Sequence, residues 1–232
     1  MTGSASMPEA FTSRLTVREA AYVARAPESR IQRAIERGQL PAKTHHKGRL
    51  TVRLIALEPL LGYAVEQRVA PYVSLGQGGR NAIRAALHPL AVEFASAASE
   101  STRSVSDSIQ VGPVKLDIGA VIADVIAELR AVLESRAKVV CDPEIRGGEP
   151  VVRGTRVPVY RLAELKAQGV SDDVLLADHP SLTREHLAAA LLYARLHPRR
   201  GRPVRATPWH GSRPEVLLPA TAESPLLEEA WG

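Results

Sequence analysis

The sequence contains little cysteine, few aromatic residues and no long apolar run. Cys141 is the single cysteine among 232 residues, so one chain can form neither an internal disulfide nor a zinc site built from several thiolates. Only 4% of residues are aromatic, which argues against large stacking platforms for single-stranded nucleic acid. No segment approaches the roughly 18 apolar residues of a membrane helix, and the polar N-terminus lacks the apolar region of a signal peptide. We therefore expect a cytoplasmic protein.

Motifs of common catalytic and phosphate-binding sites are also missing. The chain has no G-x-x-x-x-G-K-[ST], no G-x-G-x-x-G before a helix and no G-x-S-x-G nucleophile elbow. His45 and His46 are neighbours, and neighbouring residues on an extended segment point to opposite faces. No further His, Asp or Glu lies close in sequence at ligand spacing. We expect no enzymatic activity, no cofactor and no metal site.

Positive charge is concentrated in the N-terminal third of the chain. Overall, 45% apolar and 24% charged residues are ordinary for a globular protein, and the length fits two small domains. Residues 14–90 hold 13 Lys/Arg and 5 Asp/Glu, whereas residues 91–145 hold 5 Lys/Arg and 9 Asp/Glu. A basic segment on a balanced chain points to a polyanion, usually nucleic acid. The alternative is a basic surface that is merely solvated.

Two short helices are predicted near the N-terminus, after a disordered leader over residues 1–13. Thr16 and Glu19 have the spacing of a capping box, which predicts that a helix over 17–25 starts there. A second helix is predicted over 28–37, where a glycine follows in the usual position after a helix end.

A wing and further helices are predicted to complete a domain over residues 14–90. Residues 39–53 have the pattern of two short strands around a basic turn at 45–48. A third helix is predicted over 54–68. A short fourth helix over 80–87 should end at the His-Pro pair that follows it.

The order helix, turn, helix, wing resembles the winged helix-turn-helix of the MerR and excisionase type, with LTVREAAYVA as the first helix and RIQRAIERGQLPA as the second. The resemblance implies that the second helix enters the major groove and that the wing touches the backbone or the minor groove. Ile31, Ala34 and Ile35 form its apolar face, which directs Arg and Gln side chains elsewhere, and these types pair bidentately with guanine and adenine. Alternatively, its arginines pair with Glu36 on a solvated helix. The predicted DNA-binding residues are Arg18, Ser29, Arg30, Gln32, Arg33, Arg37, Lys43, His45, His46, Lys47 and Arg49.

Residues 91–137 link the two halves of the chain. Strands are predicted over 91–95 and 109–117, with a Ser-rich loop between them. The helix predicted over 119–136 carries seven large aliphatic side chains in one stripe at helical spacing. Such a stripe is either intrachain core or a dimer interface. We predict a homodimer formed through residues 119–198, because a two-fold protein matches a palindromic operator.

The segment RGGEPVVRGTRVPV, residues 146–159, combines three glycines, two prolines and three arginines. Glycines that allow positive φ and prolines that fix φ predict turns around a brief extended run. A compact helical region follows up to Leu196, with helices capped by Ser171 and Thr183. Over residues 138–198 this pattern resembles the domain-of-unknown-function family 433 (DUF433). The family signature G-G-x-P-x-x-x-G-T-R stands at Gly147, Gly148, Pro150, Gly154, Thr155 and Arg156.

The resemblance to DUF433 implies a fold and a set of partners. Members of this family resemble small helix-turn-helix, homeodomain-like folds and often act as antitoxins beside PIN-domain ribonucleases, in the manner of VapB and VapC. The signature loop is then either a structural turn or a direct binding surface. Because residues 138–198 are nearly neutral, dimerisation or toxin docking fits their charge better than DNA contact.

Residues 199–232 are rich in Pro, Arg and Ser, with widely spaced large apolar residues. This composition is typical of a segment that folds on binding, and a disordered end without a role is the alternative. An arginine suits the acidic metal pocket of a PIN nuclease, because its planar guanidinium pairs bidentately with carboxylates. The predicted toxin-binding residues are Arg202, Arg205, Trp209, Arg213, Leu217, Leu218, Leu226, Leu227 and Trp231.

These observations lead to one fold class and one preferred function. We expect a mainly α fold with short β strands, made of an N-terminal winged helix-turn-helix and a C-terminal homeodomain-like helix-turn-helix unit. The expected function is that of a type II, VapBC-like antitoxin that inhibits a PIN-domain ribonuclease and binds double-stranded operator DNA to repress its own operon. The alternative is a stand-alone transcription regulator, or an excisionase-like architectural protein, without a toxin partner.

Overall fold

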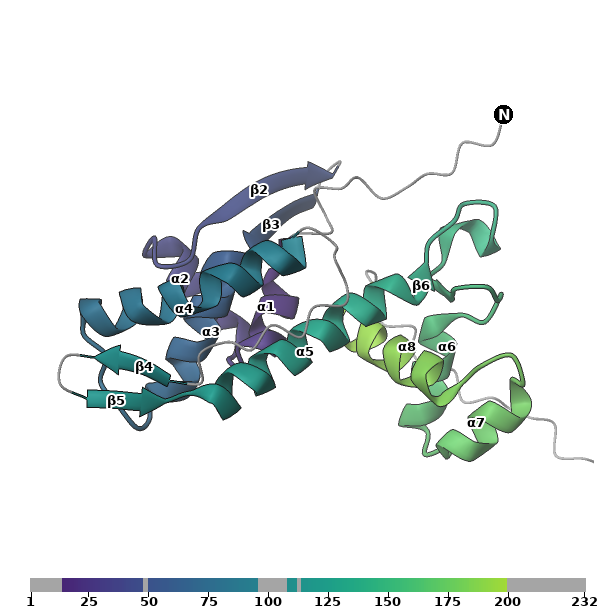
Figure 1. Cartoon of the computed structure of the whole chain (residues 1–232). Helices are drawn as coiled ribbons and strands as arrows, with labels where there is room; N and C mark the ends of the chain where they lie inside the picture. The colour runs from purple at the N-terminus through teal and green to yellow at the C-terminus, as the bar shows by residue number, and fades with distance from the viewer. Residues whose placement is uncertain (1–13, 48–49, 96–107, 112–113, 200–232) are drawn as a thin grey trace, which may run out of the picture. The chain divides into compact units, whose positions relative to one another are not determined.

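The described part of the chain is mainly helical with short strands, which confirms the expected fold class at that level. The structure is a computed structural model and describes residues 14–47, 50–95, 108–111 and 114–199. Figure 1 labels the helices and strands. Within the described ranges, no helix combines the length and the apolar character needed to cross a lipid bilayer.

Helix α1 (Val17–Val23) begins at the capping box predicted from the sequence. The Thr16 Oγ1 accepts a hydrogen bond from the backbone N of Glu19 (3.4 Å), and the Glu19 carboxylate accepts one from the backbone N of Thr16 (2.7 Å). Two N–H groups that a helix start leaves unpaired are thereby satisfied. A turn with Arg25 at a φ of 47° then leads into α2 (Glu28–Glu36).

The strands of a three-stranded antiparallel sheet come before and after these two helices in the sequence. After Gly38, whose φ of 70° fits the predicted helix end, the chain forms the hairpin of β2 (Ala42–Lys47) and β3 (Leu50–Ala56). The first strand, β1 (Arg14–Thr16), pairs with the other edge of β3, so the order is β1-β3-β2. The predicted wing is therefore a hairpin on the central strand.

The turn of this hairpin lies later in the chain than predicted. A turn over 45–48 is wrong, because His45 pairs with Val52 and His46 pairs with Thr51 in the ladder. β-Branched partners favour a paired strand, and they extend β2 through both histidines. Residues 54–56 likewise belong to β3 and not to the following helix.

Helices α3 (Leu57–Val69) and α4 (Gln77–Ala95) follow and pack against each other. Pro59 lies in the first turn of α3, where its missing N–H costs no helical hydrogen bond. Pro89 lies inside α4, so the predicted helix end at His88-Pro89 and the predicted strand over 91–95 are both wrong. Packing decides this case, because the buried face of α4 continues through the proline. Its buried members are Ile83, Leu87, Leu90 and Ala91.

A second hairpin precedes the longest predicted helix. The single strand predicted over 109–117 is two antiparallel strands, β4 (Ser108–Val111) and β5 (Val114–Asp117). The predicted Ser-rich loop covers residues 96–108; residues 96–107 lie outside the described ranges, and Ser108 belongs to β4. Helix α5 (Gly119–Ala137) then forms as the sequence indicates.

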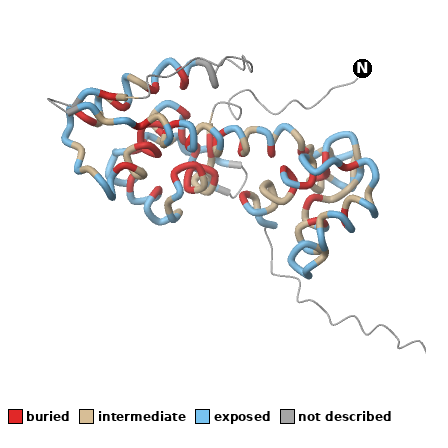
Figure 2. The backbone as a smooth tube through the Cα atoms, turned by 60° about the horizontal axis from the view of Figure 1, so that its bottom comes forward, coloured by how far each residue is buried: buried red, intermediate tan, exposed pale blue. Residues whose placement is uncertain are grey.

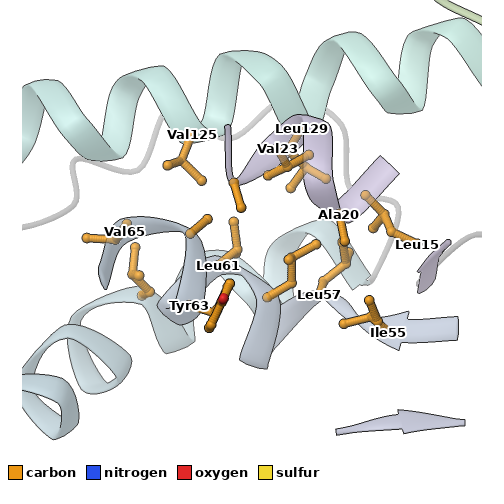
Figure 3. Packing of buried hydrophobic residues seen from close by; sticks show 14 of the residues in the cluster. Leu15, Ala20, Val23, Ile55, Leu57, Leu61, Tyr63, Val65, Val125 and Leu129 are labelled. Atoms are coloured by element: carbon orange, nitrogen blue, oxygen red, sulfur yellow. The ribbon is translucent and has the colours of Figure 1, made fainter. Parts of the chain in front are cut away.

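The apolar stripe of α5 is packed within the chain. All seven of its large aliphatic side chains lie in or against one core that also contains residues of the N-terminal domain. Figure 3 shows Val125 and Leu129 directed toward the side of that core that holds Val23 and Leu61. The intrachain explanation of the stripe therefore accounts for it, and α5 offers no broad uncovered apolar face for a dimer.

The C-terminal domain is built around a second core. Strands β6 (Val139–Val140) and β7 (Val151–Val152) pair antiparallel, with the 3-10 helix η2 (Arg146–Gly148) between them. Three helices follow: α6 (Val159–Ala167), α7 (Asp172–Asp178) and α8 (Arg184–Leu196). Their buried positions alternate with exposed ones along the tube in Figure 2. The core residues are Val139, Val152, Val159, Leu162, Leu175, Leu182, Leu187 and Ala190.

The predicted caps of the last two helices are confirmed. The Ser171 Oγ accepts a hydrogen bond from the backbone N of Val174 (3.4 Å) at the start of α7. The Thr183 Oγ1 accepts one from the backbone N of His186 (3.2 Å) at the start of α8. Gly169 before them has a φ of 89°, as a glycine after a helix end requires.

A buried charge cluster connects α1, α5 and the residue after α8. Glu19 is fully buried, and its carboxylate accepts hydrogen bonds from Arg136 Nε (2.6 Å) and Arg136 Nη2, and lies 3.1 Å from His197 Nε2. Burial raises the pKa of Glu19. The His197 hydrogen bond and the charge and hydrogen bond of Arg136 outweigh burial and lower this pKa to about 2. Glu19 thus carries its charge throughout the physiological range.

Candidate nucleic-acid interface

One face of α2 is buried and the other carries the predicted DNA-binding residues. Ile31 and Ala34 are buried, because positions three apart share a helix face. The remaining face is exposed to solvent. Its exposed members include Ser29, Arg30, Gln32, Arg33 and Arg37.

The three arginines of this face keep their positive charge unpaired. Arg30 Nη1 donates to Gln67 Oε1 (3.4 Å) and Arg33 Nε donates to the Ser29 carbonyl (3.3 Å). Glu36 forms its ion pair with Arg53 of β3 (3.9 Å), and not with an arginine of its own helix. No ion pair to a described carboxylate neutralises the arginines of this face. The alternative of pairing within a solvated helix is therefore not what α2 adopts.

Arg18 does not belong to this face. Its Nε pairs with Glu28 Oε1 at 2.7 Å, and both side chains are partly exposed. Arg18 lines a groove together with Arg195 and Leu196 of α8, apart from the surface that the α2 arginines line. A role of Arg18 in DNA binding stays a prediction that this geometry does not favour.

The wing places further basic residues beside α2. Lys43, His45 and His46 are exposed on β2, and His46 Nδ1 lies 3.3 Å from Thr51 Oγ1 on the facing strand. Arg53 pairs with Thr44 and therefore lies on the same face of the hairpin as His46, whereas Lys43 and His45 lie on the other face. Arg53 reaches Glu36 and so ties the hairpin to the end of α2. Lys47 ends β2, and the position of its side chain lies outside the description, as does Arg49 entirely.

Two residues of α3 complete this surface, and the sequence analysis missed them. Tyr63 and Gln67 line a cavity of about 240 Å³ together with the exposed arginines of α2. They are four positions apart and therefore share one face of α3, on the side of the helix opposite to Leu61 and Val65. The sequence of α3 gives no signal for this pair, because the helix also carries Glu58, Glu66 and Arg68. The polar lining residues are Arg30, Arg33, Arg37, Gln39, Tyr63 and Gln67.

The signature loop of the C-terminal domain is largely architectural. Gly147, Gly148 and Gly154 have φ values of 66°, 85° and 76°, a region that side chains rarely adopt. The Thr155 hydroxyl donates to the Val152 carbonyl (2.8 Å) and accepts from the backbone N of Val157 (3.1 Å). These bonds close the turn between β7 and α6.

Two further signature positions differ in what they contribute. The Pro150 carbonyl accepts a hydrogen bond from the backbone N of Val159 (2.9 Å), which holds the start of α6. Arg156 is exposed and forms no hydrogen bond or ion pair with another described residue. Of the signature residues, Arg156 is therefore the one whose side chain is available to a partner.

The predicted toxin-binding residues cannot be placed on this surface. They all lie in residues 200–232, outside the described ranges. Arg199, the last described residue, pairs with Glu149 and lies over the Tyr160 ring, with the guanidinium carbon 4.9 Å from the ring centroid.

Comparison with known proteins identifies the C-terminal domain. A stretch of 68 residues is 48% identical to the uncharacterized protein y4eO of Sinorhizobium fredii (strain NBRC 101917 / NGR234), and it covers 29% of this chain and 31% of that relative. No solved structure matches the chain. Residues 139–194 match the family described as "Protein of unknown function (DUF433)". The region that carries the G-G-x-P-x-x-x-G-T-R signature is thus a DUF433 domain.

Proposed function

We propose that this protein binds double-stranded DNA through α2 and the β2–β3 hairpin. The observation that carries the proposal is the exposed face of α2, where Arg30, Arg33 and Arg37 have no carboxylate partner among the described residues. Unpaired arginines on one helix face attract phosphates and present the planar donor pairs that read guanine.

The wing supplies the second half of the proposed interface. Lys43, His45 and His46 are exposed on β2, and Arg53 connects the hairpin to the end of α2. A basic hairpin beside a helix that lies in the major groove meets the neighbouring backbone or the minor groove. The proposal therefore assigns base reading to α2 and backbone contact to the wing.

Selection of binding sites from a random duplex library tests this assignment with the full chain. Arg33→Ala is expected to weaken binding and to relax the selected sequence at one or more positions, as loss of a base-reading arginine does. Arg161→Ala serves as the control. It removes the same charge from an exposed position on α6, outside the proposed interface. Equal affinity and an equal selected sequence for Arg33→Ala and the wild type would refute the role of α2.

We further propose that the protein is the antitoxin of a VapBC-like pair and represses its own operon. Support comes from the DUF433 domain, from the unpaired Arg156 of its signature loop and from the arginines and tryptophans in the sequence of residues 200–232. In this proposal the C-terminal half captures a PIN-domain ribonuclease and an arginine enters its acidic metal pocket.

The antitoxin proposal expects the neighbouring gene to encode a nuclease that stops growth when it is expressed alone, and growth rescue by this chain tests it. A chain ending at Pro198 is expected to lose rescue, and single Arg→Ala changes at 202, 205 and 213 should identify the inserted arginine. Loss of one partner of a buried charge pair lowers affinity by about 10²- to 10³-fold or more. Full rescue by the shortened chain would move toxin capture to the folded domains, with Arg156→Ala as the next variant.

A further inference from the structure

The cavity between α2 and α3 has an unusual lining for a surface hollow. Its charged lining residues are Arg30, Arg33 and Arg37, and no carboxylate is among the described residues that line it. Its volume of about 240 Å³ lies below the range of about 300–1,000 Å³ that is typical of drug-sized ligands. The cavity therefore suits a small anionic group.

The nearest acidic residues are engaged elsewhere. Glu66 precedes Gln67 in α3, and its carboxylate lies 3.9 Å from the Arg84 guanidinium of α4. Glu36 at the end of α2 pairs with Arg53 of the wing at 3.9 Å. Neither carboxylate forms an ion pair with an arginine of the cavity, so these arginines can still pair with an anionic ligand.

Tyr63 gives the cavity a polar group without a partner. The residue as a whole is only 7% exposed and lines the cavity, and its hydroxyl forms no hydrogen bond with any described residue. The hydroxyl oxygen is not among the fully buried polar atoms that lack a partner, so it is open to the cavity, where a ligand can accept its hydrogen bond. Tyr63 is a member of the buried core of the N-terminal domain, which holds its side chain in place (Figure 3). Burial raises the pKa of Tyr63, against the opposing charge of Arg30, so the hydroxyl keeps its proton and acts as a donor.

Gln67 orients one of the arginines at this place. Its Oε1 accepts a hydrogen bond from Arg30 Nη1 (3.4 Å), which ties α2 to α3 across the cavity. An arginine held in this way is preorganised for a fixed oxygen ligand, because less side-chain freedom is lost on binding. The hydroxyl and the guanidinium groups therefore present several donors to one small volume.

We propose that this cavity binds a phosphate group of the DNA backbone, with Tyr63, Gln67 and Arg30 as its specific contacts. Arg, Tyr and Gln side chains all donate to backbone phosphates, and such contacts fix the register of a protein on the duplex. The inference rests on the proposed DNA binding and adds α3 to the interface. It also separates two roles, because Arg30 then sets affinity for every sequence while Arg33 contributes to base preference.

Binding of the full chain to a random-sequence duplex library tests the phosphate site. Tyr63→Phe removes only the hydroxyl and is expected to weaken binding by about tenfold to a hundredfold, as loss of a hydrogen bond to a charged group does. Gln67→Glu gives Arg30 a carboxylate partner within the protein, which competes with the phosphate. The plot of log K against log salt should then become less steep by about 0.9, which corresponds to the loss of one phosphate contact. Tyr72→Phe is the matched control, because Tyr72 is 86% exposed and does not line the cavity.

The outcomes separate this inference from the proposed function. If Arg33→Ala weakens DNA binding but Tyr63→Phe and Gln67→Glu bind as the wild type does, DNA binding stands and the phosphate site is wrong. If inorganic pyrophosphate binds the wild type but not Tyr63→Phe while duplex affinity is the same for both, the cavity is an anion site that DNA does not use. A wild-type chain with no affinity for duplex DNA refutes both. Unchanged thermal unfolding midpoints for the variants exclude misfolding as the cause.

Discussion

Replacement of Glu19 by Gln should be among the most destabilising conservative changes in the chain. The substitution keeps the size of the side chain but removes the buried charge that Arg136 and His197 face. Arg136 is only 16% exposed at its side chain, so it would retain a charge that water solvates poorly. The capping box of α1 would keep an oxygen acceptor but lose the carboxylate.

The size of the effect follows from the pKa of Glu19. Its decrease from 4.5 to about 2 corresponds to about 3 kcal/mol of stability at neutral pH. Breaking a buried pair by removing one partner typically costs about 3–5 kcal/mol, which agrees with this value. We therefore expect Glu19→Gln to lower the free energy of unfolding by about 3–5 kcal/mol at pH 7.

The pH dependence of the free energy of unfolding tests the charge of Glu19 in a second way. A carboxyl whose pKa is lowered by folding contributes its stability above the unfolded pKa and loses it as pH falls toward the folded pKa. The wild type should therefore lose this contribution between about pH 4.5 and about pH 2, whereas Glu19→Gln should not. The two proteins should converge in stability near the acidic end of that window.

Urea denaturation at a series of pH values measures both quantities. Glu36→Gln is the control, because Glu36 is 62% exposed at its side chain and its contact with Arg53 is long, at 3.9 Å. A Glu19→Gln protein that unfolds with the wild-type free energy at pH 7 would refute the reasoning. If the free energies of unfolding of the two proteins differ by the same amount down to pH 2, the destabilisation comes from the changed shape of the side chain and not from its lost charge.

Three further predictions concern packing, backbone conformation and assembly. Leu129→Ala should lower the free energy of unfolding by about 2–5 kcal/mol in urea denaturation, because Leu129 is fully buried where α5 meets the N-terminal core. Val174→Ala, at a position that is 50% exposed, should change it little. Gly154→Ala should cost about 1–2 kcal/mol through backbone strain alone, because φ is 76° and no atom stands within 4 Å of the new Cβ. Gly76→Ala meets equally open space without a positive φ and should be neutral, so equal costs at both glycines would contradict the strain argument. For assembly, the homodimer predicted through residues 119–198 must use a surface other than the packed stripe of α5. Light scattering of the full chain should show this homodimer, and a monomer at micromolar concentration would end that prediction.

Local signals in the sequence predicted much of the fold. Thr16, Ser171 and Thr183 were identified as caps because capping depends on residues only three positions away. The glycines of the signature loop were identified because positive φ selects glycine at single positions. Features that depend on a few neighbouring residues can be predicted from one sequence.

Features that depend on distant packing could not be predicted in the same way. Pro89 is a strong helix breaker locally, yet α4 continues through it because its buried face is already packed. Glu19 was identified as a cap, but its contact with His197 joins residues 178 positions apart. Tyr63 belongs to the candidate site only because α2 and α3 come together, and no pattern within α3 encodes that contact.

The packing of α5 in the N-terminal core has a consequence for how such a protein can be divided or recombined. The DUF433 match begins at residue 139, directly after α5 ends, and it stops at residue 194. Leu196 and His197, which contact the N-terminal core and Glu19, lie just beyond the match. A fragment over residues 14–90 would lack the cover that α5 provides and would expose part of its core to water. A gene fusion that exchanges the DUF433 domain should therefore be joined near residue 138, so that α5 stays with the N-terminal domain. It should also rebuild the contacts of Leu196 and His197 for each new combination of N-terminal and DUF433 domains.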